Sequence, residues 1–166
     1  MALAQLSNYQ NVMVGVDGSK QAKRAVQKAI AVAKRNQATL YIVSVLNVSE
    51  LTSLGKSRFG FGAVDPEVLD DFKHNMDQVA AKYRDAAVQA GLKHVEIHVT
   101  FGNSKLELAK NLPQLLGADL IVLGATGANV VERMMMGSNA SYVVTNAAVD
   151  VLIVRTDLDN QQIKVF

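Results

Sequence analysis

Five short apolar segments alternate with segments of helical periodicity, and this alternation restricts the fold more than any other feature of the chain. The apolar segments are residues 12–16, 38–46, 94–99, 120–123 and 151–154. After the first of them, apolar residues recur every three or four positions from Ala22 to Ala33, the spacing of a helix with one buried face. Alternating strands and helices predict a parallel sheet with helices on both faces.

The composition of each strand predicts its place in that sheet. Val12–Val16 and Leu120–Leu123 are almost continuously apolar, as strands buried on both faces are, so they belong in the middle. Residues 94–99 alternate between polar and apolar side chains, which indicates an edge strand. With right-handed crossovers, we expect a single-domain α/β fold with the strand order 3-2-1-4-5.

Local signals predict where the helices begin. Ser19 is placed to cap the first helix, and Asp65 followed by Pro66 opens the second. The spacing Ser104-x-x-Glu107 predicts a capping box, and Pro113 should disturb the helix that follows. The apolar stripe expected to be buried on the second helix is Val68, Leu69, Phe72, Met76, Val79, Tyr83, Ala86 and Ala90.

Composition excludes several classes of site. The chain has no cysteine, which excludes disulfides, thiolate zinc sites and a cysteine nucleophile. No apolar run approaches the roughly 18 residues that cross a bilayer, and the first ten residues are too short and polar for a signal peptide. We therefore expect a cytoplasmic location and no membrane partner.

The basic residues between Lys20 and Arg35 are interpreted as the solvated face of a helix rather than a nucleic-acid surface. The net charge of the whole chain is only +2. Nucleic-acid binders usually concentrate a larger basic excess on one face. No nucleic-acid partner is expected.

Glycines after the fourth strand form the most informative motif. Gly124-Ala125-Thr126-Gly127 is followed by nine residues and then by Gly137-Ser138. Glycines let backbone amides approach a phosphate closely, and a helix that begins at Ser138 favours an anion at its first turn. The alternative is an ordinary strand-to-helix loop that happens to contain glycines. Ligands in such sheets bind where the connections diverge, which places this loop opposite Asp17-Gly18-Ser19.

Other phosphate-binding and hydrolase motifs are absent. The turn after the first strand holds only Gly18, so the dinucleotide fingerprint G-x-G-x-x-G is missing. Gly55-Lys56 lacks the preceding glycine of a P-loop, and no G-x-S-x-G nucleophile elbow occurs.

The spacing G-2x-G-9x-G-[ST] resembles the signature of the ATP-binding branch of the universal stress protein family. The segments Val14–Ser19 and Val151–Val154 extend the resemblance, which covers about residues 10–156. It implies a Rossmann-like fold of the adenine nucleotide alpha hydrolase-like type. It also implies one universal stress protein domain over residues 1–166, with a core at about 10–156 and a polar tail at 157–166.

The resemblance also implies a set of site residues. Asp17 matches the aspartate near the phosphates and their metal, for which a hard cation such as Mg²⁺ (or Mn²⁺) suits one carboxylate plus nucleotide oxygens. The alternative is that Asp17 only braces its own turn, but its position at the carboxyl end of a central strand favours the metal or phosphate contact. Val45 matches the residue beside the adenine. The implied nucleotide-binding set is Val16, Asp17, Val45, Gly124, Ala125, Gly127, Gly137, Ser138, Asn139 and Ala140.

Family members commonly carry an apolar, a small and an acidic residue after the Gly-Ser pair, where this chain has Asn139, Ala140 and Ser141. The missing hydroxyl at Ala140 removes one potential phosphate contact, which bears on affinity more than on the site itself.

Two further segments have an interpretation of their own. His94, Glu96 and His98 share one strand face, which is read as a wet edge rather than a metal cluster. The long connection from Asn47 to Val64 contains three glycines and is expected to be a mobile cover over the site.

The function predicted first is a cytoplasmic ATP-binding protein that acts as a nucleotide-dependent regulatory dimer in a stress response. The first alternative is a slow ATPase or nucleotidyl-transfer enzyme, although no dedicated general base or P-loop lysine is evident and no catalytic residue is assigned. The second is a structural dimer that binds no nucleotide. The homodimer is expected to form through Val151–Val154, an apolar strand at the sheet edge without charge or proline.

Overall fold

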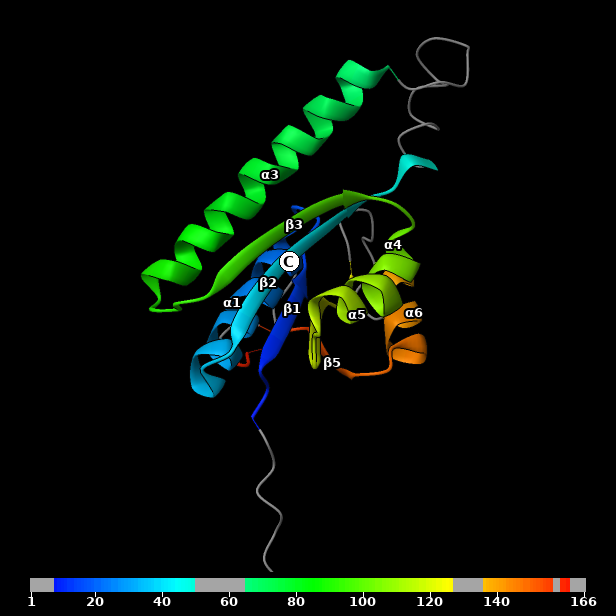
Figure 1. The fold of residues 1–166 in the computed structure, drawn as a ribbon. Coiled ribbons are helices and arrows are strands. Elements are labelled where there is room, and N and C mark those ends of the chain that lie inside the picture. The colour runs from blue at the N-terminus through cyan, green and yellow to red at the C-terminus, as the bar shows by residue number, and fades with distance from the viewer. Residues whose placement is uncertain (1–7, 50–64, 127–135, 157–158, 162–166) are drawn as a thin grey trace, which may run out of the picture.

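Five parallel strands form one sheet in the computed structural model, which describes residues 8–49, 65–126, 136–156 and 159–161 (Figure 1). The strands are β1 (Asn11–Gly15), β2 (Thr39–Leu46), β3 (Val95–Phe101), β4 (Leu120–Gly124) and β5 (Asp150–Val154). Their order is β3-β2-β1-β4-β5, and every neighbouring pair is parallel. The predicted fold class and strand order are confirmed.

Burial follows the predicted positions in the sheet. Val12, Met13 and Val14 of β1 have no exposed surface, and the first four residues of β4 are buried. No residue of the edge strand β3 is fully buried. The two central strands are therefore the apolar interior of the sheet.

Helices cover the sheet in two layers (Figure 1). On one side lie α1 (Lys20–Asn36) and α3 (Pro66–Gln89), packed over Val12, Val14, Leu40 and Ile42. On the other lie α4 (Ser104–Leu106), the π-helix η1 (Glu107–Asn111), α5 (Leu112–Leu116) and α6 (Ser138–Asn146). This second layer packs over Met13, Val43 and Ile121. Within the described residues, no helix is both long and apolar enough to span a bilayer.

The start of α1 is as predicted. The Ser19 side chain accepts a hydrogen bond from the Ala22 amide at 3.1 Å, so it caps one of the amides that lack an intrahelical partner. The buried residues of α1 are mostly alanines, among them Ala25, Ala29 and Ala33. These small side chains allow the helix to lie close to the sheet.

The predicted buried stripe of α3 is wrong at Val68, Phe72 and Ala86, while its other five residues are partly buried. Val68 and Phe72 are 42% and 41% exposed, Ala86 is exposed, and the buried positions are Ala80 and Ala87. The helix packs against β2 and β3, and its first turns extend past the end of β3 (Figure 1). Periodicity fixes which face of a helix is apolar, but not how far the helix overlaps the sheet.

The predicted capping box at Ser104 is also wrong. Asn103 is the cap, because its Oδ1 accepts from the amides of Lys105 at 3.1 Å and Leu106 at 3.3 Å. The Glu107 carboxylate instead accepts from the Asn111 side chain at 2.8 Å. The predicted disturbance at Pro113 takes the form of η1, one turn of π-helix directly before α5. Proline supplies no amide to the helix ladder, and a wider turn accommodates this.

Polar contacts hold the beginning of β1 against distant parts of the chain. The Asp119 carboxylate accepts from the amides of Gln10 at 2.7 Å and Asn11 at 3.1 Å. The Tyr9 hydroxyl donates to Asp150 at 2.7 Å, and this hydrogen bond raises the pKa of Tyr9. The first strand is thus attached to the starts of both β4 and β5.

Candidate functional site

A cavity of about 340 Å³ lies at the carboxyl ends of β1, β2 and β4. The loop after β1, the end of β2, the segment after β4 and the first turn of α6 all contribute to its wall. Nine of the ten residues expected at the site line it: Val16, Asp17, Val45, Gly124, Ala125, Gly137, Ser138, Asn139 and Ala140. The tenth, Gly127, lies outside the described residues.

Asp17 lies two residues after the end of β1 and braces the turn into α1. Its Oδ1 accepts a hydrogen bond from the Ser19 amide at 2.9 Å, and Gly18 between them has a φ of +80°, which glycine adopts without strain. The side chain is exposed at the cavity wall. Burial, with a smaller contribution from the Asp17 charge, raises the pKa of Tyr83 on α3.

The first turn of α6 supplies backbone donors to the same cavity. Gly137 is the residue before the helix, and its amide donates to the Ala125 carbonyl at 2.7 Å, which joins the helix start to the end of β4. Ser138, Asn139 and Ala140 occupy the first three helical positions, and among the described residues no side chain caps the helix. Unpaired amides and the helix dipole together favour an anion at this place.

The opposite wall is mostly apolar and includes residues that the sequence analysis did not assign. Val43, Leu108 and Leu123 line it beside Val45, and Ser104 adds a hydroxyl that donates to the Val45 carbonyl at 3.5 Å. Gly15, Ser19, Ala22 and Thr126 complete the lining. Ser104 comes after the end of β3, as Asp17 comes after the end of β1. Because loops at the carboxyl ends of parallel strands lie close together, this position in the sequence could have indicated Ser104 as a site residue. Leu108 carries no such signal, because η1 sets its position.

Comparison with known proteins decides the family. Residues 8–155 match the sequence model of the Universal stress protein family. The chain belongs to the universal stress protein family. A putative universal stress protein of Staphylococcus epidermidis is 37% identical over 150 residues, which cover 90% of this chain and 86% of that relative.

Solved structures of family members share this fold. The universal stress protein UspA from Lactobacillus plantarum superposes with a TM-score of 0.76 at 29% identity, over 90% of this chain and all of that one. A universal stress protein crystallised in complex with cAMP superposes with a TM-score of 0.64 at 27% identity, over 89% of this chain and 98% of that one.

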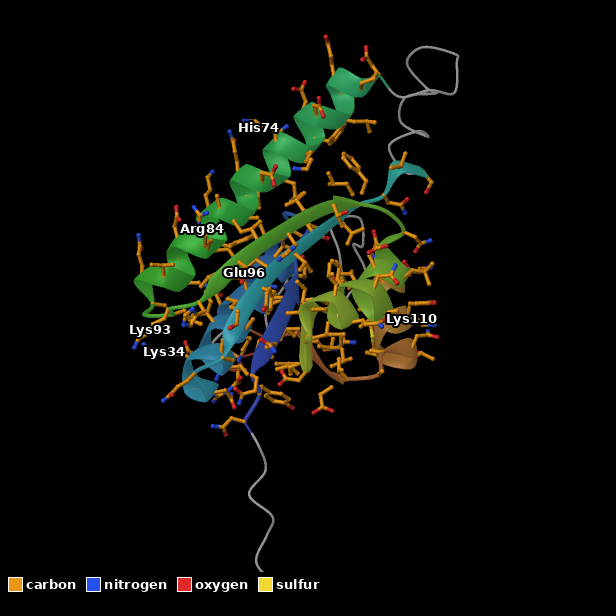
Figure 2. The ribbon with its side chains drawn as sticks, in the orientation of Figure 1. Lys34, His74, Arg84, Lys93, Glu96 and Lys110 are labelled. Atoms are coloured by element: carbon orange, nitrogen blue, oxygen red, sulfur yellow. The ribbon has the colours of Figure 1, made fainter. Side chains whose placement is uncertain are left out.

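His98 of β3 and His94, which precedes the strand, do not line this cavity. His98 Nε2 is 3.5 Å from the Glu96 carboxylate, and the His98 ring is tilted against Tyr41 with ring centroids 6.0 Å apart. Figure 2 labels Glu96 on β3. Among the residues that the structure describes, no three His, Asp or Glu side chains are grouped to hold a metal ion. Residues 50–64 lie outside the described ranges, so the mobile cover over the site stays a prediction.

Gly124 of the glycine motif has a packing role that does not depend on any ligand. A Cβ at this position would lie 3.0 Å from the Cβ, carbonyl carbon and carbonyl oxygen of Gln21. Two of these atoms are helix backbone, which cannot turn aside as a flexible side chain can. The absence of a side chain at Gly124 therefore allows the start of α1 to contact the end of β4.

We predict that Gly124→Ala lowers the free energy of unfolding by about 1–3 kcal/mol, because overpacking against α1 forces a backbone shift. Gly102→Ala is the matched control, since its Cβ also meets an atom at 3.0 Å, but that atom is Cγ of the flexible Glu107 side chain. Urea unfolding followed by circular dichroism measures both. Equal stability of the two variants would show that α1 is not held tightly against β4.

Proposed function

We propose that this universal stress protein belongs to the ATP-binding branch of its family and binds ATP, with Mg²⁺ or Mn²⁺, in the cavity at the carboxyl ends of β1, β2 and β4. It would act in the cytoplasm as a nucleotide-dependent regulatory dimer in a stress response, with residues 1–166 as one domain. The observation that carries the proposal is the uncapped first turn of α6 on the same cavity as Asp17. The family member crystallised with cAMP supports an adenine nucleotide as the ligand class.

Each part of the cavity suits one part of the nucleotide. The amides of Ser138, Asn139 and Ala140 are the donors for phosphate oxygens, as at other helix N-termini. Val45 and Leu123 offer apolar surface for the base. Glycine at 124 and 137 leaves backbone accessible beside the phosphates, and Gly127 is assigned to the same path from the sequence.

The charge of the cavity favours the metal complex of the nucleotide over the free nucleotide. Of the described residues that line the cavity, Asp17 alone has an ionisable side chain, and it is acidic. No lysine, arginine or histidine in this lining neutralises a triphosphate. A divalent cation held between Asp17 and the phosphate oxygens reverses the sign of that interaction.

The same lining argues for binding rather than rapid catalysis. Phosphoryl transfer needs positioned charge around the transferred group and a residue that orients the nucleophile. In the described lining only Asp17 could serve, and it already braces its turn. Any hydrolysis of bound ATP is therefore expected to be slow.

Ser138→Asp tests the phosphate position. Ser138 is exposed at the first helical position, where an added carboxylate favours α6 itself by roughly 0.3–1 kcal/mol but repels phosphate. We expect titration calorimetry with MgATP to show a loss of affinity on the order of tenfold or more, with the melting temperature unchanged or raised. Ser138→Asn, similar in shape but neutral, should bind within about threefold of wild type. If the Asp variant binds MgATP as tightly as the Asn variant does, the phosphates do not lie at the start of α6.

Asp17→Asn tests the metal. If the carboxylate holds Mg²⁺ on the phosphates, the substitution weakens ATP binding in Mg²⁺ and leaves it unchanged or improved in EDTA, because a negative charge beside the phosphates is removed. The carboxamide oxygen of the new side chain can still accept the bond from the Ser19 amide, so the turn is kept. Calorimetric titrations in the two buffers give the comparison. An equal loss in both would assign Asp17 to turn bracing alone.

The dimer is proposed through β5. This strand is the edge of the sheet, Leu152 is 37% exposed, and Val151 and Ile153 are partly exposed. An uncovered apolar edge invites pairing with another chain. Two identical strands paired about a two-fold axis close the edge without forming fibres.

We predict that Leu152→Lys produces a monomer by analytical ultracentrifugation, because the charge lies in the middle of the paired strands. Leu115→Lys is the matched control, because Leu115 is 73% exposed on α5 and is not part of the strand proposed to pair; this variant should stay dimeric. Wild-type protein that sediments as a monomer at tens of micromolar (an order-of-magnitude choice for a stable interface) would contradict the dimer.

A further inference from the structure

A second cavity of about 330 Å³ lies between α1 and β5 and shares no lining residue with the candidate nucleotide site. Its α1 side is formed by positions 28, 31, 32 and 35, which recur on one helix face. Its other side is Leu152–Thr156 with Asn160. The cavity exists because α1 packs mainly on β1 and β4 and leaves the outer strand partly uncovered, as the exposure of Leu152 shows.

Three cations converge on this cavity. Lys28 and Arg35 reach it from α1, two turns or roughly 10 Å apart, and Arg155 reaches it from the end of β5. No aspartate or glutamate is among its lining residues in the described part of the chain. Within the same residues, no ion pair joins Arg35 or Arg155 to a carboxylate. The Lys28 ammonium donates a hydrogen bond to Asn160 Oδ1, which holds it at the rim.

The other basic residues of α1 add to the positive electrostatic potential around this cavity. Its residues Lys20–Asn36 include six lysines and arginines and no acidic residue. Arg24 lies one turn before Lys28 on the same face, so the row of cations continues past the cavity. Like charges crowded around one hollow repel each other, and a bound anion relieves that repulsion.

The shape and chemistry of the cavity select the kind of anion. Arginine presents a fork of donors that matches phosphate or carboxylate oxygens in pairs, and two arginines line this cavity with the hydroxyl of Thr156. Ala31, Val32 and Leu152 add apolar surface. Its volume is at the lower end of the roughly 300–1,000 Å³ of small-molecule sites, too small for a folded partner.

We propose that this cavity is a binding site for a small organic phosphate with two or more negative charges. Arg35 and Arg155 pair with its oxyanions, Lys28 adds a third charge, and Ala31 and Val32 contact its carbon skeleton. The site is independent of the nucleotide cavity and would stand even if that cavity bound nothing.

Tripolyphosphate is the probe, and the amide resonances of ¹⁵N-labelled full-length protein report where it binds. We expect shifts in residues 28–35 and 152–156 that saturate with the probe. The double variant Arg35→Gln/Arg155→Gln should weaken this binding by about tenfold or more, because both charge-assisted pairs are lost. Both side chains are exposed, so the fold should be unaffected.

The matched control also removes two positive charges, both from positions on α1 that do not line the cavity. Lys23 and Lys34 are exposed and do not line the cavity. Lys34 lies beside Gly91, just after the C-terminal end of α3, and Figure 2 labels it at the C-terminal end of α1. Lys23→Gln/Lys34→Gln should keep affinity within about threefold, since neither exposed side chain lines the cavity and each contributes only a screened, long-range attraction.

Ala31→Leu tests the cavity itself, because it fills the space while every charge remains and helix propensity is kept. We expect it to weaken tripolyphosphate binding as strongly as the arginine variant does. The proposal is overturned if Ala31→Leu binds like wild type, or if the lysine control loses as much affinity as the arginine variant. It is also overturned if the shifts fall only on residues 124–126 and 137–140. If a single-stranded oligonucleotide shifts the same amide resonances at a lower concentration than tripolyphosphate does, the proposal is wrong and the surface binds nucleic acid.

Discussion

The parallel pairing of β1 with β4 is the constraint on which the rest of the structure depends. Val12 and Val14 lie opposite Leu120 and Val122, and all four are buried. The chain leaves β1 through α1 on one face of the sheet and reaches β4 through α4, η1 and α5 on the other (Figure 1). Because these connections diverge, the carboxyl ends of the two strands are left uncovered, and the candidate site lies there.

Much of this arrangement could be predicted from the sequence, because burial on two faces leaves a signal in each strand. The apolar runs of β1 and β4 and the alternation in β3 were enough to order the sheet. The errors lie where tertiary packing decides. Val68 and Phe72 belong to an apolar stripe, yet the first turns of α3 pass beyond the sheet that would bury them. At the start of α4, Asn103 and Ser104 are both good caps, and their backbone conformations choose between them.

The residues of the candidate site also divide into those that the sequence predicts and those that depend on tertiary packing. Position after a strand predicts Asp17, Gly124 and Ser138, and these do line one cavity. Leu108 could not be predicted, because Pro113 indicates that the helix is disturbed but not that the disturbance is a π-helical turn, which carries Leu108 to the cavity. Gly124 of the glycine motif also has two roles. In the proposed function Gly124 leaves a path for phosphate, and in the structure it lets α1 approach β4.

The bond between Asn11 and Asp119 spans 108 positions of the chain, and this distance has a consequence for biosynthesis. The strand that ends up in the middle of the sheet is the first to leave the ribosome, and one of its two partners is among the last. At the usual pace of translation, β1 waits roughly 5 to 20 seconds for β4. During that time β1 and β2 can pair only with each other and with β3, so one apolar edge stays open. An open apolar edge of this kind is prone to aggregation until β4 emerges and closes it.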